Sequence, residues 1–266
     1  MGRSGRVLLA AACAATLLAS TARAADDPLA KARQLYNQKQ YQAAVSAAEQ
    51  ARLTPARADA ADLVAARAYL ERFRETSASD DLANARLRLG RLDPIKFDPR
   101  ERAEYVIGLG EALYFDGAYG AAADTFESIL RAPDSIATEN HDRVLDWWAD
   151  ALDRDTRPRP DIDRQAVYRS IRARMDDEIA VRPGNSVASY WRAAAARAQG
   201  DLQSAWDAAQ SAWVRAPLAS DGGSKLREDL DRLVTTAIIP ERAKLLGQPP
   251  QRLILDWEQF KERWKR

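Results

Sequence analysis

The sequence predicts an all-α protein, and three observations lead to that prediction. Ala, Leu, Arg, Glu and Asp dominate the chain, and Ala and the long straight-chain residues lose little side-chain freedom in a helix. No segment alternates apolar and polar residues with the period of two that a half-buried strand shows, and Val, Ile and Thr form no long clusters. Blocks of helical length are separated by Pro and Gly residues, which interrupt helices.

The blocks follow one another along almost the whole chain, with ends that a sequence defines only to within about two to four residues. In order, helices are expected at Pro28–Asn37, Tyr41–Arg52, Arg57–Arg74, Asp80–Arg91, Pro99–Phe115, Tyr119–Arg131, Asp142–Asp153, Ile162–Val181, Val187–Gln199, Leu202–Arg215, Lys225–Ile238, Glu241–Leu246 and Leu255–Trp264.

Several of these ends have a physical cause in the sequence. Asp98 precedes Pro99, and Glu101 follows at the third helical position, so the two acidic side chains are placed to accept hydrogen bonds from free backbone N–H groups. Prolines stand just beyond five helices, where a helix cannot continue. They are Pro55, Pro94, Pro133, Pro183 and Pro217.

The prolines close pairs of helices, and the pairs resemble one another. The segment YNQKQYQAAVSAAEQARLTP at residues 36–55 aligns with YFDGAYGAAADTFESILRAP at residues 114–133 on Tyr41 and Tyr119. Both segments carry an aromatic residue five positions before that tyrosine, an alanine three positions after it, and a closing proline. Ala205 and Pro217 repeat much of this pattern.

This pattern resembles the tetratricopeptide repeat family, whose unit is a helix–turn–helix of about 34 residues. The small residues that the family requires inside the first helix are matched by Ala32, Ala66, Gly110, Ala149 and Ala193, and the alanine of the second helix by Ala44, Ala122 and Ala205. The second and fourth pairs carry longer loops and fit less closely. The resemblance implies an α-solenoid of about five repeats over residues 25–218, followed by a helical extension with capping helices over residues 219–266.

Residues 1–24 have the features of a cleaved signal peptide. Arg3 and Arg6 precede the apolar run Val7–Leu18, which is too short for a membrane span, and residues 22–24 read Ala-Arg-Ala, a cleavage pattern. We therefore expect an exported bacterial protein, periplasmic or else secreted, with no stable membrane span after cleavage. An uncleaved anchor, or a lipid on Cys13, the only cysteine, are the alternatives.

The amino-acid composition argues against several classes of function. The 40 Lys and Arg residues balance 39 Asp and Glu residues, which argues against a nucleic-acid binder. His141 is the only histidine, so a pair of histidines cannot hold a metal, and we expect it to cap a helix at the surface rather than to catalyse. The acidic residues Asp142, Asp146, Asp150 and Asp153 share helical spacing, and a solvated helix face is favoured over a cation site. We expect no metal, no cofactor and no enzyme.

The resemblance also implies where a partner would bind, because the first helices of such repeats line an inner groove. The residues expected there are Arg33, Tyr36, Asn37, Arg67, Tyr114 and Phe115. Two guanidinium groups near Asn37 could hold a carboxylate, as some family members hold a peptide C-terminus, while the aromatic rings grip apolar side chains. The alternative is that both arginines only pair with acids on neighbouring turns.

The last helix carries Trp257, Phe260 and Trp264 on one face. A cap over the end of the repeats is favoured over docking on a partner or a membrane. The leading hypothesis is thus a non-enzymatic protein- or peptide-binding scaffold of the cell envelope. The alternatives are a structural subunit of an envelope assembly that docks through its last helix, and a hydrolase.

Overall fold

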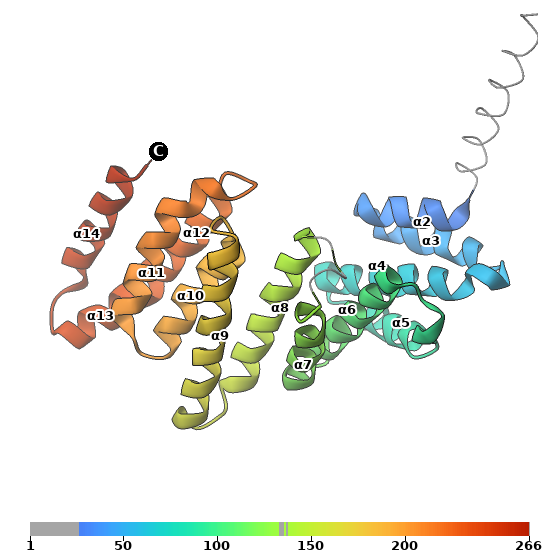
Figure 1. Ribbon diagram of the computed structural model, residues 1–266, viewed down its shortest axis with the longest axis horizontal. Coiled ribbons are helices and arrows are strands. Elements are labelled where there is room, and N and C mark those ends of the chain that lie inside the picture. The colour runs from blue at the N-terminus through green and yellow to red at the C-terminus, as the bar shows by residue number, and fades with distance from the viewer. Residues whose placement is uncertain (1–26, 133–135, 137, 266) are drawn as a thin grey trace, which may run out of the picture. The chain divides into compact units, whose positions relative to one another are not determined.

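The computed structural model describes residues 27–132, residue 136 and residues 138–265. Within these ranges every regular element is helical, which confirms the prediction of an all-α protein (Figure 1). The chain divides into two compact units, of which unit 1 ends at Gly117 and unit 2 begins at Ala118. The signal peptide, residues 1–24, and Pro133 lie outside the described residues.

Consecutive helices of unit 1 pack as antiparallel neighbours: α2 on α3, α3 on α4, and α4 on α5 (Figure 1). In addition α4 packs against both α2 and α6, so these three helices share one layer. The helices α3 and α5 are linked by an ion pair between Glu49 of α3 and Arg88 of α5. The elements are α2 (Pro28–Asn37), α3 (Tyr41–Arg52), the 3₁₀ turn η1 (Pro55–Arg57), α4 (Ala58–Thr76), α5 (Ser79–Leu89), the 3₁₀ turn η2 (Pro94–Lys96) and α6 (Pro99–Phe115).

The order of packing in unit 2 is similar. Helix α7 packs on α8, α9 on α10 and α10 on α11, while α10 also packs against α8 and α12. The elements are α7 (Tyr119–Leu130), α8 (Thr138–Thr156), α9 (Asp161–Val181), α10 (Ser186–Ala198), α11 (Leu202–Arg215), the 3₁₀ turn η4 (Ala216–Leu218), α12 (Ser224–Leu233), the π-helical segment η5 (Val234–Ile238), α13 (Ile239–Leu246) and α14 (Pro250–Arg263).

Small residues allow the helices to cross closely. The positions at which the sequence places a small residue are all buried, and larger side chains there would force the helices apart. They are Ala32, Ala44, Ala66, Gly110, Ala122, Ala149, Ala193 and Ala205.

The predicted cap of α6 is confirmed. The Asp98 carboxylate accepts a hydrogen bond from the backbone N–H of Glu101 at 2.8 Å, and Glu101 Oε2 accepts one from the backbone N–H of Asp98 at 3.4 Å. This reciprocal pair satisfies two N–H groups that a helix start leaves without partners. It also holds the Glu101 side chain at the start of α6.

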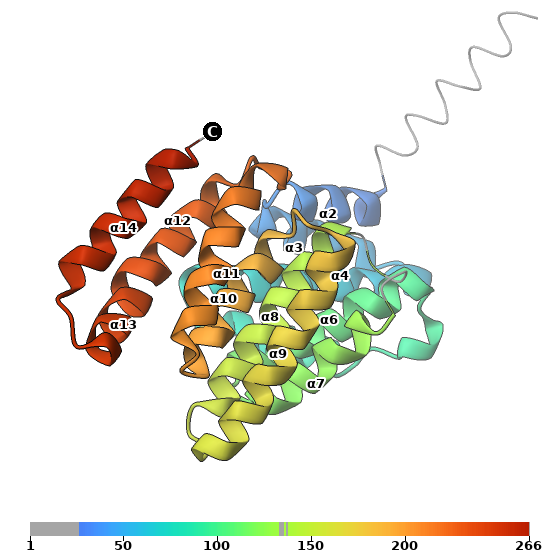
Figure 2. The same cartoon turned by 60° about the vertical axis from the view of Figure 1, so that its left-hand side comes forward.

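The predicted interruption before Pro240 is wrong, because α12, η5 and α13 follow one another without a gap. A proline inside a helix lacks an N–H and crowds the carbonyl four residues earlier. The wider π-helical turn ends two residues before Pro240, and the hydroxyls of Thr235 and Thr236 donate to carbonyls of the preceding turn, Asp231 and Arg232, at 2.7 Å each. Helix α14 then runs back beside this long helix in both views (Figures 1 and 2).

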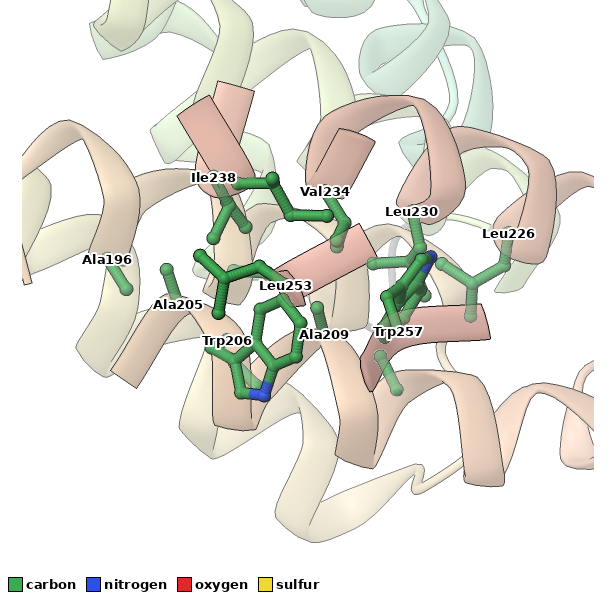
Figure 3. Close-up of a cluster of buried hydrophobic side chains, with 14 of the residues drawn as sticks. Ala196, Ala205, Trp206, Ala209, Leu226, Leu230, Val234, Ile238, Leu253 and Trp257 are labelled. Atoms are coloured by element: carbon green, nitrogen blue, oxygen red, sulfur yellow. The ribbon is translucent and has the colours of Figure 1, made fainter. Parts of the chain in front are cut away.

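The core of unit 2 joins the last helices to α10 and α11. Trp206 of α11, Leu230 of α12, Ile238 of η5 and Trp257 of α14 meet in one buried cluster (Figure 3). The region predicted as an extension after residue 218 therefore shares a hydrophobic core with the helices before it.

Tyr168 connects α9 to α8 and provides a pH-dependent test of this packing. Its hydroxyl donates to Asp153 Oδ1 at 2.8 Å, and burial, with the nearby carboxylate, raises its pKa from 10 to about 12. Since the folded-state pKa is raised, the neutral phenol stabilises the fold fully below pH 10 and loses that contribution as the pH rises toward 12. We expect the absorbance titration of Tyr168→Phe to lack a tyrosine component near pH 12; loss of a component near pH 10 would contradict the contact.

Candidate binding face of the N-terminal unit

The residues predicted to line a groove all belong to unit 1 and to the layer formed by α2, α4 and α6. Helix α2 carries Arg33, Tyr36 and Asn37, α4 carries Arg67, and α6 carries Tyr114 and Phe115. Because α4 lies against both of the other helices, side chains from all three can meet. We call this surface the α2–α4–α6 face.

Of the two arginines predicted for this face, Arg33 is the accessible one. Its side chain is 47% exposed, and Nη2 lies 2.6 Å from Glu101 Oε1. The other carboxylate oxygen of Glu101 accepts the capping hydrogen bond described above, so the helix start orients the group that holds Arg33. This pair is charge-assisted and short, yet it remains open to solvent.

Arg67 is placed differently, because only 6% of its surface is exposed. Its guanidinium lies over the Tyr36 ring, 4.9 Å from the centroid, and Nη1 lies 3.5 Å from Glu104 Oε2. The Tyr36 hydroxyl donates to Glu71 Oε1 at 3.4 Å, and Glu71 also pairs with Arg74 at 2.6 Å. A cation over an aromatic ring and a continuous set of polar contacts hold these side chains in one arrangement.

Reasoning from sequence did not identify the glutamates that pair with the arginines of this face. Within the α2–α4–α6 face, three arginines each form an ion pair with a glutamate, so none of these positive charges is left unbalanced. The pairs are Arg33 with Glu101, Arg67 with Glu104 and Arg74 with Glu71, and Glu111 of α6 is also buried. The available signal was Glu111, which occupies in its helix pair the position that Arg33 and Arg67 occupy in theirs.

Each of the two arginines forms an ion pair with a carboxylate of α6, Arg33 with Glu101 and Arg67 with Glu104. A carboxylate ligand that approached both guanidinium groups would compete with Glu101 for Arg33 and with Glu104 for the buried Arg67. Of these two arginines, Arg33 is therefore the one that an incoming group can reach more easily.

The remaining predicted residues divide between surface and core. Asn37 is exposed and Tyr114 is half-buried, so both can be reached from outside. Phe115 packs edge-to-face on Phe73, with ring centroids 4.9 Å apart, and belongs to the hydrophobic cluster around Leu70.

A cavity of about 410 Å³ adjoins Arg33, between α2 and the first turns of α4 and α6. Leu29 and Phe97 give it an apolar wall, while Arg33, Arg57, Lys96 and Glu101 line its polar side. A cavity with a few polar groups next to apolar surface suits the side chain of a bound segment.

His141 in unit 2 is buried, which corrects the prediction of a surface cap. Helix α8 begins at Thr138, four residues earlier than expected, so His141 lies inside the helix. Its Nδ1 is 3.0 Å from Arg182 Nη2, and its Nε2 is 3.4 Å from Glu178 Oε1. The ring thus bridges α8 and the end of α9.

The acidic residues of α8 have protein partners. Asp142 pairs with Arg182 at 2.6 Å, Asp150 with Arg154 and Asp153 with Arg157. Asp146 accepts a hydrogen bond from the Trp191 indole at 2.7 Å, and desolvation by the surrounding protein raises its pKa although its side chain keeps contact with solvent. Across residues 27–132, 136 and 138–265, no group of three or more His, Cys, Asp or Glu side chains is arranged to hold a metal ion.

The aromatic stripe of α14 points largely inward. Trp257 is fully buried and Phe260 packs against the core of unit 2, whereas Trp264 is 47% exposed. Of the three residues predicted for partner docking, Trp264 therefore offers the most surface.

No model of a known protein family, no curated protein and no solved structure matches this chain. None of the helices in the described part of the chain combines the length and the apolar character required to cross a membrane.

Proposed function

We propose that this chain is a non-enzymatic scaffold of the bacterial cell envelope, built of repeats that resemble the tetratricopeptide repeat, and that it holds a segment of a protein or peptide on the α2–α4–α6 face. The export of the protein rests on the features of residues 1–24, and the solenoid on the pattern of small residues and prolines.

The observation that carries this proposal is the buried charge of the α2–α4–α6 face. Arg67, Glu71 and Glu111 are each less than one-tenth exposed. Burying charged side chains costs more free energy than burying apolar ones of similar size, so helix packing alone gives no reason for them. A preorganised polar network beside accessible aromatic and guanidinium groups is the arrangement that recognition of a partner uses.

The balance of charge suggests how the partner binds. Arg33 can exchange Glu101 for a carboxylate of the partner, while Tyr36, Asn37 and Tyr114 contact its backbone and side chains. The cavity beside Arg33 accepts one side chain of the segment. A clamp that uses both Arg33 and Arg67 would in addition require Glu104 to be displaced.

Arg33→Gln tests the proposal, since Arg33 is exposed and its loss leaves the buried network in place. We expect the affinity for the partner, identified by crosslinking from the native envelope, to fall about 10-fold or more in calorimetry, the usual worth of a charge-assisted contact. Arg86→Gln is the matched control, because Arg86 is 50% exposed and pairs with Asp116 at 3.0 Å but lies on α5, outside the face.

Equal affinity for the wild type and Arg33→Gln would contradict binding through this face. The alternative of an envelope subunit that docks through α14 predicts the opposite pattern in the same assay. In that case Trp264→Ala would weaken capture of the partner, and Arg33→Gln would leave it unchanged.

A further inference from the structure

The turn between α13 and α14 exposes four large apolar side chains. Leu245 and Leu246 at the end of α13 are 70% and 52% exposed, and Ile254 and Leu255 near the start of α14 are 40% and 60% exposed. Single exposed leucines are ordinary on a protein surface, whereas large apolar side chains that gather at one place mark a site of interaction. Figures 1 and 2 both show this turn at an outer corner of unit 2, and we call residues 242–255 the α13–α14 corner.

Buried neighbours hold this corner in place. Ala243 and Leu253 belong to the hydrophobic core of unit 2, and the backbone N–H of Gln248 donates to the carbonyl of Ala243 at 3.1 Å. Gly247 follows α13 with a φ of 60°, the left-handed conformation in which many helices end. Because Ala243 and Leu253 face the core, the exposed leucines beside them are directed away from it.

The charged side chains of the corner are all positive. Between Glu241 and Asp256 the sequence contains Arg242, Lys244 and Arg252 but no acidic residue. Lys244 and Arg252 are exposed, and neither forms an ion pair within the described part of the chain. The corner therefore combines apolar side chains with two cations that an external anion can reach.

The acids at either end of this stretch do not neutralise these cations. Glu241 accepts hydrogen bonds from Arg197 Nε, at 3.0 Å to one carboxylate oxygen and 3.1 Å to the other. Asp256 is exposed one helical turn after Arg252 and forms no ion pair with it among the residues that the structure describes. Asp256 also marks where the acidic part of the α14 surface begins, so the positive corner ends at Leu255.

We infer that the α13–α14 corner docks on the surface of an anionic lipid bilayer. Leu245, Leu246 and Leu255 enter the boundary between headgroups and acyl chains, while Lys244 and Arg252 extend their charges to the lipid phosphates. Leucines on a projecting turn can enter a bilayer without a complementary groove, and anionic headgroups supply the negative charge that the corner lacks. This contact is separate from the α2–α4–α6 face, which lies in unit 1.

Cosedimentation with lipid vesicles tests the inference. The processed protein, residues 25–266, is mixed with vesicles of equal parts phosphatidylglycerol and phosphatidylcholine, or of phosphatidylcholine alone, in about 0.1 M salt. Residues 1–24 contain three of the 40 basic residues and none of the 39 acidic ones, so the processed chain has 37 basic and 39 acidic residues. Its net charge does not attract it to an anionic membrane. We nevertheless expect the partition coefficient to be about 10-fold or more higher for the anionic vesicles, because the corner is locally positive.

A first pair of variants tests the cations. Lys244→Gln combined with Arg252→Gln is expected to lower the partition coefficient on anionic vesicles about 10-fold or more, the usual effect of two basic side chains at such a surface. Lys31→Gln combined with Arg91→Gln is the matched control. It removes the same charge from exposed positions of unit 1 and should leave the partition coefficient unchanged.

A second pair of variants tests the leucines. Leu245→Ser combined with Leu255→Ser should lower the partition coefficient at least 10-fold, since each leucine loses the favourable transfer of its side chain from water. Leu53→Ser combined with Leu87→Ser changes two exposed leucines of unit 1 and should have no effect. Circular dichroism checks that each variant keeps the helical content of the wild type.

Equal partition of the wild type into the two kinds of vesicle would overturn the inference, as would a partition coefficient that neither variant of the corner lowers. A second copy of the chain is the other occupant that could cover the leucines. If light scattering shows a dimer that Leu245→Ser with Leu255→Ser dissociates, and the wild type does not sediment with anionic vesicles, the corner is an interface between copies and the inference is wrong.

Discussion

Replacement of Trp257 by alanine is expected to lower the free energy of unfolding of unit 2 by about 3–5 kcal/mol, the usual cost of removing a large aromatic side chain from a core. Trp257 is fully buried, and its ring contacts Trp206, Trp213 and Phe260 at centroid distances of 5.7, 5.5 and 5.6 Å. Its indole N–H also donates to Asp231 at 2.8 Å. Alanine would leave a cavity and remove this hydrogen bond.

Urea unfolding monitored by the remaining tryptophans measures the loss, because all of them report on unit 2. Trp264→Ala is the matched control: the same substitution in the same helix, at a side chain that is 47% exposed, should change the stability by less than about 1 kcal/mol. Similar losses in the two variants would mean that α14 does not dock on α11 and α12 through Trp257.

Gly223→Ala is expected to destabilise unit 2 by about 3 kcal/mol or more, for two reasons that add. Gly223 has a φ of 73°, in the left-handed region that a side chain disfavours. A Cβ atom on Gly223 would also overlap the backbone carbonyl of Ala216, which cannot rotate away as a side chain can. The chain needs this close approach to turn from η4 into α12.

Gly222→Ala separates the two causes. Gly222 has nearly the same conformation, with a φ of 69°, but a Cβ atom there would meet nothing within 4 Å. Its replacement by alanine should lower the free energy of unfolding only by the cost of the left-handed conformation, about 1–2 kcal/mol. If urea unfolding gives the same loss for both variants, the contact between Gly223 and Ala216 does not constrain the turn.

Local features of the fold could be predicted from the sequence because their causes lie within a few residues. The capping box of Asp98 and Glu101 needs only the first turn of α6, and the 3₁₀ turns η1, η2 and η4 contain the prolines at positions 55, 94 and 217. The continuity through Pro240 could not be predicted in this way. It depends on buried contacts of Ile238 before the proline and of Ala243 after it, which hold the chain helical on both sides.

The candidate site likewise combines features that helical spacing predicts with features that only the packing of the helices decides. Helical spacing placed Arg33, Tyr36 and Arg67 on one side of their helices, and the structure brings them to one face. Spacing within a helix contains no information about which acid on another helix will meet a given arginine. The pairing of Arg33 with Glu101 and of Arg67 with Glu104 follows from the approach of α6 to α2 and α4.

Composition and periodicity by themselves determined that this protein is all-α, and they located most of its helices and the alanines where the helices cross. The tertiary structure alone decided which charges are exposed, paired or buried: Arg33 is open, Arg67 is covered, and His141 bridges two helices. The physical reason is that the two effects depend on residues at different distances along the chain. Helix formation depends on neighbours three or four residues away, whereas the solvation of a charge depends on every helix that packs around it.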